Sequence, residues 1–491
     1  MGDSPGFSSA WPKAHAASTR GFVSKVPSFS LVILSLLLAH TAPALSQNGQ
    51  NLDQQFQAAV AEYHAGQYAE AATQLEALLP QVPQSFDLQE LLGLVYAAQS
   101  RNVQAVQHLD AAVRLKPESA AAHTNLAAAL MHAGKADLAG EQFRKAIALE
   151  PHDYDANHNL AEFYIETGKV ASAVPFLKEA QRVQPSSYDN GYDLALAYYL
   201  GGQPGPARQL IQSLVQQKDT GELHNLLGKV EEKDGQFVAA VNQFQTAATM
   251  DPSEDNLFDW GSEFLLHRTY EPAIDIFQQA IKRYPASSRL LIGLGISFYS
   301  RGKYEEAVKA LLAAAALNPN DARCYFFLSK AYDSSPNEAD DVIQCFRRYS
   351  ELEPGNEKAA YYYVMSLWKG KRSADQGLDP QQVEALLKKT IALDSRLPEA
   401  HAQLGNLYSD QHDYEKSIPE YKRALELNAN LPDTHYRLAL DYVHSGHKDL
   451  AQGEFAAYQR LRAQHMAELD KEKAEVRQFV YAEKSSNAAP Q

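Results

Sequence analysis

Apolar and small residues recur along the chain at helical spacing, in stretches separated by short polar turns. Residues 288–321 show the pattern clearly, with a glycine-containing turn at 302–304 and a proline, Pro319, after the second stretch. Proline cannot continue a helix, so it marks the end of that stretch. The second stretch carries its apolar residues on one helix face: Ala307, Leu311, Ala314 and Leu317. The pattern predicts two antiparallel helices joined by a tight turn.

This helix pair is repeated along most of the chain. Prolines that follow the second stretch lie 34 residues apart: Pro83, Pro117, Pro151 and Pro185. Alanines inside that stretch have the same spacing of 34: Ala71, Ala105, Ala139, Ala173 and Ala207. Glycines at the turn follow the same register: Gly134, Gly168, Gly202, Gly235 and Gly302. A fixed period of this length predicts a repeat protein, in which each unit packs on its neighbours.

The unit resembles the tetratricopeptide repeat (TPR), whose pattern is W-x2-L-G-x2-Y followed by Ala, Phe, Ala and Pro. Leu294-Gly295 and Phe298 occupy the first half of that pattern in residues 288–321. The eighth position is small in eleven of the twelve units: Ala59, Gly93, Ala127, Ala161, Ala195, Gly228, Gly261, Gly295, Ser329, Gly405 and Ala439. The resemblance implies an all-α fold, a right-handed α-solenoid of about twelve helix-turn-helix repeats.

The predicted solenoid covers residues 52–465. Its units are 52–85, 86–119, 120–153, 154–187, 188–220, 221–253, 254–287, 288–321, 322–356, 357–397, 398–431 and 432–465. The tenth unit is the longest, because residues 369–380 extend the turn between its helices. Residues 466–484 are predicted to form a charged capping helix over the last repeat, and 485–491 a disordered tail.

The N-terminal segment has the pattern of an export signal. Lys13, Arg20 and Lys25 precede an apolar run at 31–39, and small residues follow at 42–46. The run is shorter than the roughly 20 residues that span a bilayer. We therefore expect residues 1–46 to be a signal peptide. The protein is then expected to be exported to the periplasm or the envelope, with no membrane span after cleavage. An uncleaved N-terminal anchor is the alternative.

Composition narrows the classes of partner. Apolar residues make up 45% of the chain and charged residues 21%, which is typical of a folded protein. With 45 basic and 60 acidic residues the net charge is −15, which argues against nucleic acid or an anionic membrane as the main partner. Cys324 and Cys345 fall in one repeat, and two buried thiols are favoured there over a disulfide.

The resemblance also places a binding wall. In TPR proteins the concave wall comes mainly from positions 2, 5, 6, 9, 12 and 13 of each first helix. At those positions this chain carries an aromatic set: Tyr192, Tyr199, Phe258, Tyr299, Phe326, Tyr361, Trp368 and Tyr436. Asn125 and Asn159 occupy position 6 of two consecutive repeats, similar to the asparagine ladder of protein O-glycosyltransferases. The alternatives are that the aromatic rings pack between repeats and that the asparagines are surface polar residues.

No catalytic motif accompanies the repeats. The sequence contains no HExxH, GxSxG or GxxxxGK[ST] pattern, and the predicted repeats leave no segment long enough for a catalytic domain. His444 and His447 lie on a turn without an evident third ligand, so no metal site and no cofactor are expected. The carboxylate clamp of chaperone-binding TPR domains is not matched by any three consecutive repeats.

The sequence thus favours a non-catalytic scaffold that binds an extended or helical segment of one or more other proteins in a concave, partly aromatic groove. A structural adaptor in envelope biogenesis, such as polysaccharide export or the assembly of pili or the outer membrane, is the second hypothesis. An enzyme acting on glycans, with its site in 357–397, is the least favoured.

Overall fold

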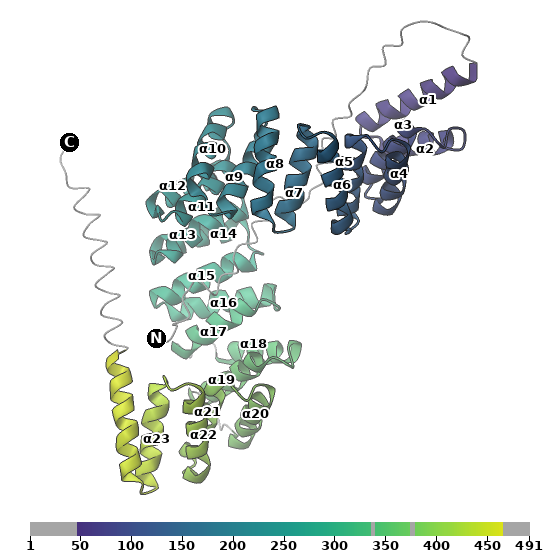
Figure 1. The fold of residues 1–491 in the computed structure, drawn as a ribbon. Coiled ribbons are helices and arrows are strands. Elements are labelled where there is room, and N and C mark those ends of the chain that lie inside the picture. The colour runs from purple at the N-terminus through teal and green to yellow at the C-terminus, as the bar shows by residue number, and fades with distance from the viewer. Residues whose placement is uncertain (1–46, 335–338, 374–378, 465–491) are drawn as a thin grey trace, which may run out of the picture. The chain divides into compact units, whose positions relative to one another are not determined.

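The computed structural model describes residues 47–334, 339–373 and 379–464. The predicted signal peptide (1–46), capping helix (466–484) and tail (485–491) lie outside these ranges. Within the described ranges the regular secondary structure is entirely helical, and successive helices run antiparallel in pairs (Figure 1). The protein is an all-α solenoid of TPR-like helix pairs.

The chain divides into two compact units, one ending at Glu263 and the other starting at Phe264, both within α13. The helices of the first unit are α1 (Gln47–His64), α2 (Tyr68–Leu78), α3 (Phe86–Ala98), α4 (Asn102–Leu115), α5 (Ala120–His132), α6 (Ala136–Leu149), α7 (Tyr154–Glu166), α8 (Val170–Val183), α9 (Tyr188–Leu200), α10 (Pro204–Gln217), α11 (Gly221–Lys233), α12 (Phe237–Met250) and most of α13 (Glu254–Leu266).

The second unit continues the same alternation. Its helices are α14 (Tyr270–Arg283), α15 (Ser288–Arg301), α16 (Tyr304–Leu317), α17 (Ala322–Ser334), α18 (Ala339–Leu352), α19 (Glu357–Ser373), α20 (Pro380–Leu393), α21 (Pro398–Asp410), α22 (Tyr414–Leu427) and α23 (Pro432–His444). A further helical stretch follows at 448–464. The odd-numbered helices are the first helices of the repeats, and the even-numbered ones are the second helices.

Short polar side chains start most of the first helices. Ser119 Oγ accepts a hydrogen bond from the Ala122 backbone N–H at 3.2 Å, and Asp153 Oδ1 accepts one from Ala156 N–H at 2.7 Å. Such N-caps satisfy backbone donors that have no partner within the helix. The turn inside a repeat uses a left-handed residue, as at Gly134 with φ 73°, where glycine is unstrained. The cap and the turn glycine together set the helix boundaries.

Small residues at the eighth position bring the two helices of a repeat close together. A Cβ at Gly93 would lie 2.5 Å from Cγ of Leu109, and one at Gly405 would lie 2.7 Å from the Tyr421 ring. No side chain fits in those spaces, so glycine is required for this helix spacing. Where the position is alanine, as at Ala127, the methyl group is fully buried.

The core of each unit is a line of clusters between helices rather than one central core. In the second unit Tyr325 and Tyr349 stack with ring centroids 3.8 Å apart, and both are buried. Cys324 is buried and Cys345 half-buried in the same repeat, and both are free thiols. Burial raises the pKa of the Cys345 thiol to about 12 and that of Cys324 further still.

Candidate functional site

The candidate site is the surface formed by positions 5, 6, 9, 12 and 13 of the first helices, which we call the first-helix face. First helices of successive repeats contact one another, as α5 contacts α7 and α7 contacts α9 in the first unit. Side chains about 34 residues apart are therefore neighbours across the repeat boundary. In the second unit α15 contacts α17, and α17 contacts α19.

Polar side chains link successive first helices in the first unit. Asn125 Nδ2 donates to Glu90 Oε1 at 3.1 Å, which joins α5 to α3. Two repeats join in the same way at α11 and α13, where Asn225 Nδ2 donates to Asp259 Oδ2 at 2.9 Å. Lys229 Nζ lies 3.1 Å from the same oxygen of Asp259. These contacts place the side chains at positions 5 and 9 of one repeat against the side chain at position 6 of the next repeat.

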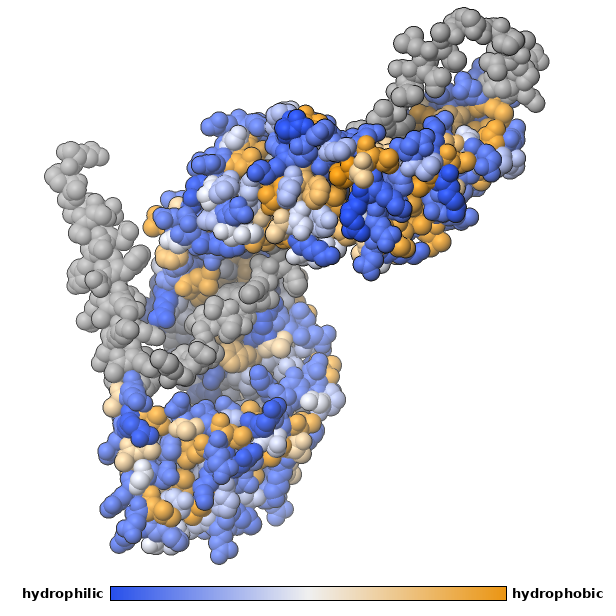
Figure 2. Space-filling model, in the orientation of Figure 1, coloured by the Kyte–Doolittle hydropathy of each residue, from blue (hydrophilic) through white to orange (hydrophobic). Residues whose placement is uncertain are grey.

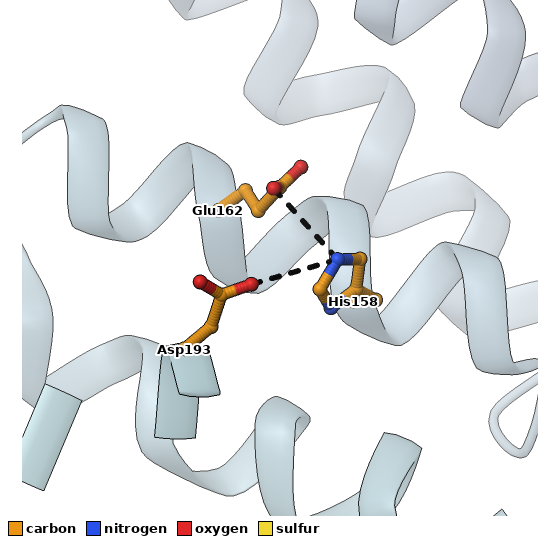
Figure 3. Close-up of side chains that lie close together, drawn as sticks. All are labelled: His158, Glu162 and Asp193. Atoms are coloured by element: carbon orange, nitrogen blue, oxygen red, sulfur yellow. Dashed lines mark ion pairs between the residues drawn. The ribbon is translucent and has the colours of Figure 1, made fainter. Parts of the chain in front are cut away.

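The same three positions form a histidine and carboxylate cluster on α7 and α9 (Figure 3). His158 Nε2 lies 3.7 Å from Glu162 Oε1 and 3.7 Å from Asp193 Oδ2. His158 and Glu162 are four residues apart and so share one face of α7. The other ring nitrogen, Nδ1, lies 3.2 Å from the amide oxygen of Asn190. We call His158, Glu162 and Asp193 the α7–α9 cluster.

The first-helix face of the first unit carries closely spaced carboxylates. Burial, with repulsion from Glu162, raises the pKa of Glu166. Burial also raises the pKa of Glu232, with a further contribution from Asp259. Glu263 is buried on the same first helix as Asp259, and burial, followed by repulsion from Glu232 and Asp259, raises its pKa to about 8. The carboxylates therefore lie close enough to disfavour one another's charge, and a cationic group beside them would relieve that repulsion.

The two predicted asparagines lie on this face. Asn125 and Asn159 are half-buried on α5 and α7. The amide of Asn125 donates a hydrogen bond to Glu90 in the preceding repeat, so this side chain links two first helices. Whether either asparagine binds a peptide backbone stays a prediction.

The predicted aromatic residues divide by exposure. Phe326 on α17 and Tyr436 on α23 are exposed, at 40% and 42% of their surface. The half-buried members of the set are Tyr199, Phe258, Tyr299 and Tyr361. Tyr199 carries Lys233 Nζ 4.8 Å above its ring, and burial raises its pKa to about 12. Tyr436 packs against Tyr458 of the following helical stretch with centroids 5.1 Å apart.

Two of the predicted wall residues are buried, and the prediction that they line a groove is wrong. Tyr192 is 7% exposed within an apolar cluster of the fifth and sixth repeats. Trp368 is 6% exposed in a cluster that also holds Leu387 and Leu404. Both rings fill the layer between consecutive repeats, where burying a large aromatic surface is strongly stabilising. The aromatic wall is therefore less continuous than the sequence predicts.

Sequence reasoning missed the closely spaced carboxylates of this face and the α7–α9 cluster. The sequence places Asp193 and Asp259 at position 6, and His158 and Glu162 fall at positions 5 and 9 of the preceding repeat. Comparing those positions across each repeat boundary would have found the cluster. The visible surface is mostly hydrophilic with scattered apolar patches (Figure 2), so no large apolar groove is evident on the side drawn.

Comparison with protein families identifies the repeats. Tetratricopeptide repeat families match residues 130–188, and also 56–120, 91–151 and 258–322, while a TPR repeat family matches 405–446. These ranges fall in both units. The chain belongs to the tetratricopeptide repeat proteins.

Curated relatives share parts of the chain. The TPR repeat-containing protein YpiA of Bacillus subtilis is 27% identical over 243 residues, which cover 48% of this chain and 55% of YpiA. Protein O-mannosyl-transferase TMTC3 of Mus musculus is 22% identical over 198 residues, covering 38% of this chain and 20% of that protein. The chain thus spans about half the length of YpiA and a smaller part of TMTC3.

Solved structures resemble the chain at low overall similarity. PilF of Pseudomonas aeruginosa is 22% identical with a TM-score of 0.36, covering 42% of this chain and 94% of PilF. A tetratricopeptide repeat protein from Parabacteroides merdae is 14% identical with a TM-score of 0.38, covering 58% of this chain and 99% of that one.

None of the helices in the described ranges combines the length and the apolar character that crossing a membrane requires.

Proposed function

We propose that this chain is a non-catalytic interaction scaffold that binds a segment of another protein along its first-helix face. The observation that carries the proposal is the succession of TPR repeats whose first helices lie side by side. Within each unit, such an arrangement offers a surface on which a partner can contact several repeats at once. Phe326 and Tyr436 supply exposed aromatic surface on it, which suits recognition.

The partner segment for the first unit is basic. Its first-helix face carries Glu166 and Glu232, whose pKa values are raised by burial and by neighbouring carboxylates. Lysine or arginine side chains of a partner would lower that repulsion and form charge-assisted hydrogen bonds. Binding to this unit should therefore weaken as the salt concentration rises.

Alanine variants of the exposed aromatic residues test the scaffold proposal. Phe326→Ala and Tyr436→Ala should each reduce capture of the partner, because exposed aromatic residues carry much of the binding energy at such surfaces. Phe237 is the matched control, since it is also 40% exposed but lies on a second helix, α12. If Phe237→Ala lowers capture as much as Phe326→Ala, the first-helix face is not the binding surface.

We further propose that the protein acts outside the cytoplasm, in the periplasm or at the envelope. The basic leader, the apolar run at 31–39 and the small residues at 42–46 support this location. Fractionation of cells with an antibody against the chain tests it, together with N-terminal sequencing of the exported form. Recovery of the chain only in the cytoplasm, with its first residues intact, would contradict export.

A structural adaptor in envelope biogenesis is the more specific form of this proposal, and it depends on the export signal.

The name of TMTC3 describes a mannosyl-transferase, but the alignment covers only 20% of that protein. Mannosyl transfer is therefore attributed to TMTC3 alone, and we propose no such activity for this chain.

A further inference from the structure

We propose that His158, Glu162 and Asp193 bind a divalent transition-metal ion of the zinc type. The three side chains come from neighbouring repeats, with His158 and Glu162 on α7 and Asp193 on α9 (Figure 3). Their ligand atoms lie within 4.8 Å of one another. The site adds a ligand class to the first-helix face and stands independently of the proposed protein partner.

The spacing of the ligand atoms fits a metal better than a shared proton. His158 Nε2 is 3.7 Å from both Glu162 Oε1 and Asp193 Oδ2, beyond hydrogen-bond length. Zinc ligands at about 2.0–2.2 Å from the ion, at tetrahedral to trigonal angles, lie about 3.3–3.8 Å from one another. Both His–carboxylate separations fall within this range, and the two carboxylate oxygens lie within 4.8 Å of one another.

Other histidine–carboxylate pairs in the protein behave differently. His401 Nδ1 lies 2.6 Å from Glu420 Oε2, and His152 Nδ1 lies 2.6 Å from Glu179 Oε1. Those pairs share a proton in a direct hydrogen bond. Among the residues that the structure describes, the α7–α9 cluster is the one group of three His, Cys, Asp or Glu side chains with metal-ligand spacing.

A second shell of contacts orients the imidazole. Asn190 is fully buried, and its Nδ2 donates to Leu177 O at 2.9 Å and to Gln181 Oε1 at 2.8 Å. Both amide protons are thereby used, so the amide oxygen faces His158 Nδ1 at 3.2 Å and accepts its proton. The protonated Nδ1 leaves the Nε2 lone pair directed at the two carboxylates. Metal-binding histidines are held in this way, with one nitrogen donating and the other coordinating.

The donor set selects the class of metal. One imidazole nitrogen with two carboxylate oxygens suits zinc or cobalt, whereas magnesium and calcium prefer oxygen ligands alone. Three protein ligands leave a fourth position for water or another donor. The Glu162 side chain is 49% exposed, so that position is accessible from solvent. The ion would also join the fourth and fifth repeats, because its ligands come from both.

Calorimetric titration of the chelator-treated full chain with zinc chloride tests the proposal. We expect the unaltered chain to bind about one zinc ion at the cluster and to take up no comparable amount of magnesium. The zinc affinity of His158→Gln and of Glu162→Gln should be lower by about tenfold or more. His401→Gln is the matched control and should bind zinc as the unaltered chain does. Glu162→Gln alters a half-exposed side chain and so preserves the fold, which circular dichroism checks.

Two results would overturn the metal site. One is the absence of zinc binding by the unaltered chain at millimolar zinc. The other is equal zinc affinity in the unaltered chain and in both cluster variants, which would assign the zinc to other histidines. Neither result bears on the protein partner, which the aromatic variants test separately.

Discussion

Single side chains of the first helices combine packing with charge, and Glu263 shows how closely the two are joined. It is 2% exposed, and Glu232 and Asp259 stand near it. Burial and repulsion both favour its protonated form, so its pKa rises to about 8 in the folded protein. The unfolded chain would hold a glutamate pKa of about 4.3. The folded protein therefore binds a proton here that the unfolded chain releases at neutral pH.

This proton makes stability depend on pH. The contribution of Glu263 is fully present below about pH 4 and is lost as the pH rises toward 8. Glu263→Gln, which copies the protonated form, should raise the free energy of unfolding at pH 9 by about 1 kcal/mol or more, and by little at pH 4. Urea titrations at both pH values measure this. Glu141→Gln, an exposed change on α6, should alter stability at neither pH.

The thiols of the ninth repeat provide a second prediction at the residue scale. Burial raises the pKa of Cys345 to about 12, so its thiolate fraction at pH 8 is about a thousandfold below that of an ordinary cysteine. A thiol reagent at pH 8 should therefore label the folded chain very slowly and label two thiols quickly after denaturation. Rapid labelling of the folded chain, or no free thiol after denaturation without reductant, would contradict the structure.

At the scale of elements, the close contact of the two helices within a repeat depends on a small eighth residue. A Cβ at Gly405 would lie 2.7 Å from the buried Tyr421 ring. Gly405→Ala should lower the free energy of unfolding by about 1–3 kcal/mol, because the ring must move in a packed core. The matched control is Gly453→Ala, where nothing lies within 4 Å and alanine should be neutral or slightly stabilising. Thermal melts of both variants decide between these outcomes.

The elements were also the part of the molecule that the sequence predicted best. Proline after the second helix, glycine at the turn and a small eighth residue act locally, so their period shows where each helix pair lies. The sequence predicted the exposure of the wall residues less well. Tyr192 and Trp368 occur at wall positions in the repeat, yet their rings turn into the layer between repeats. A rotation of about 100° separates adjacent residues on a helix, so a register error of one residue moves a side chain from the surface to the core.

Polar contacts across repeats were harder still to predict from sequence. The α7–α9 cluster combines the residues at positions 5 and 9 of one first helix with the residue at position 6 of the next. None of these three residues indicates a cluster when its repeat is considered alone. Its geometry arises only when the spacing of neighbouring first helices is known. Exposure of Phe326 and Tyr436 likewise depends on which neighbouring residues cover them.

For the whole molecule, the division into two units predicts unfolding in more than one step. Each repeat contacts mainly its neighbours, so cooperativity extends over a limited number of repeats. Trp260 lies in the first unit and Trp368 in the second. Single-tryptophan variants retaining one or the other should give different urea midpoints by fluorescence. Coincident midpoints that also match the circular dichroism transition would indicate one cooperative unit.

Site-specific photo-crosslinking tests the central claim, that the first-helix face binds a protein segment, most directly. A photoreactive residue replaces Phe326 or Tyr436 on first helices, and Phe237 or Val103 on second helices, all of them exposed positions. We predict crosslinks from the first pair to one contiguous segment of one partner, and none to that segment from the second pair. Crosslinks to the same partner segment mainly from Phe237 and Val103 would contradict the account.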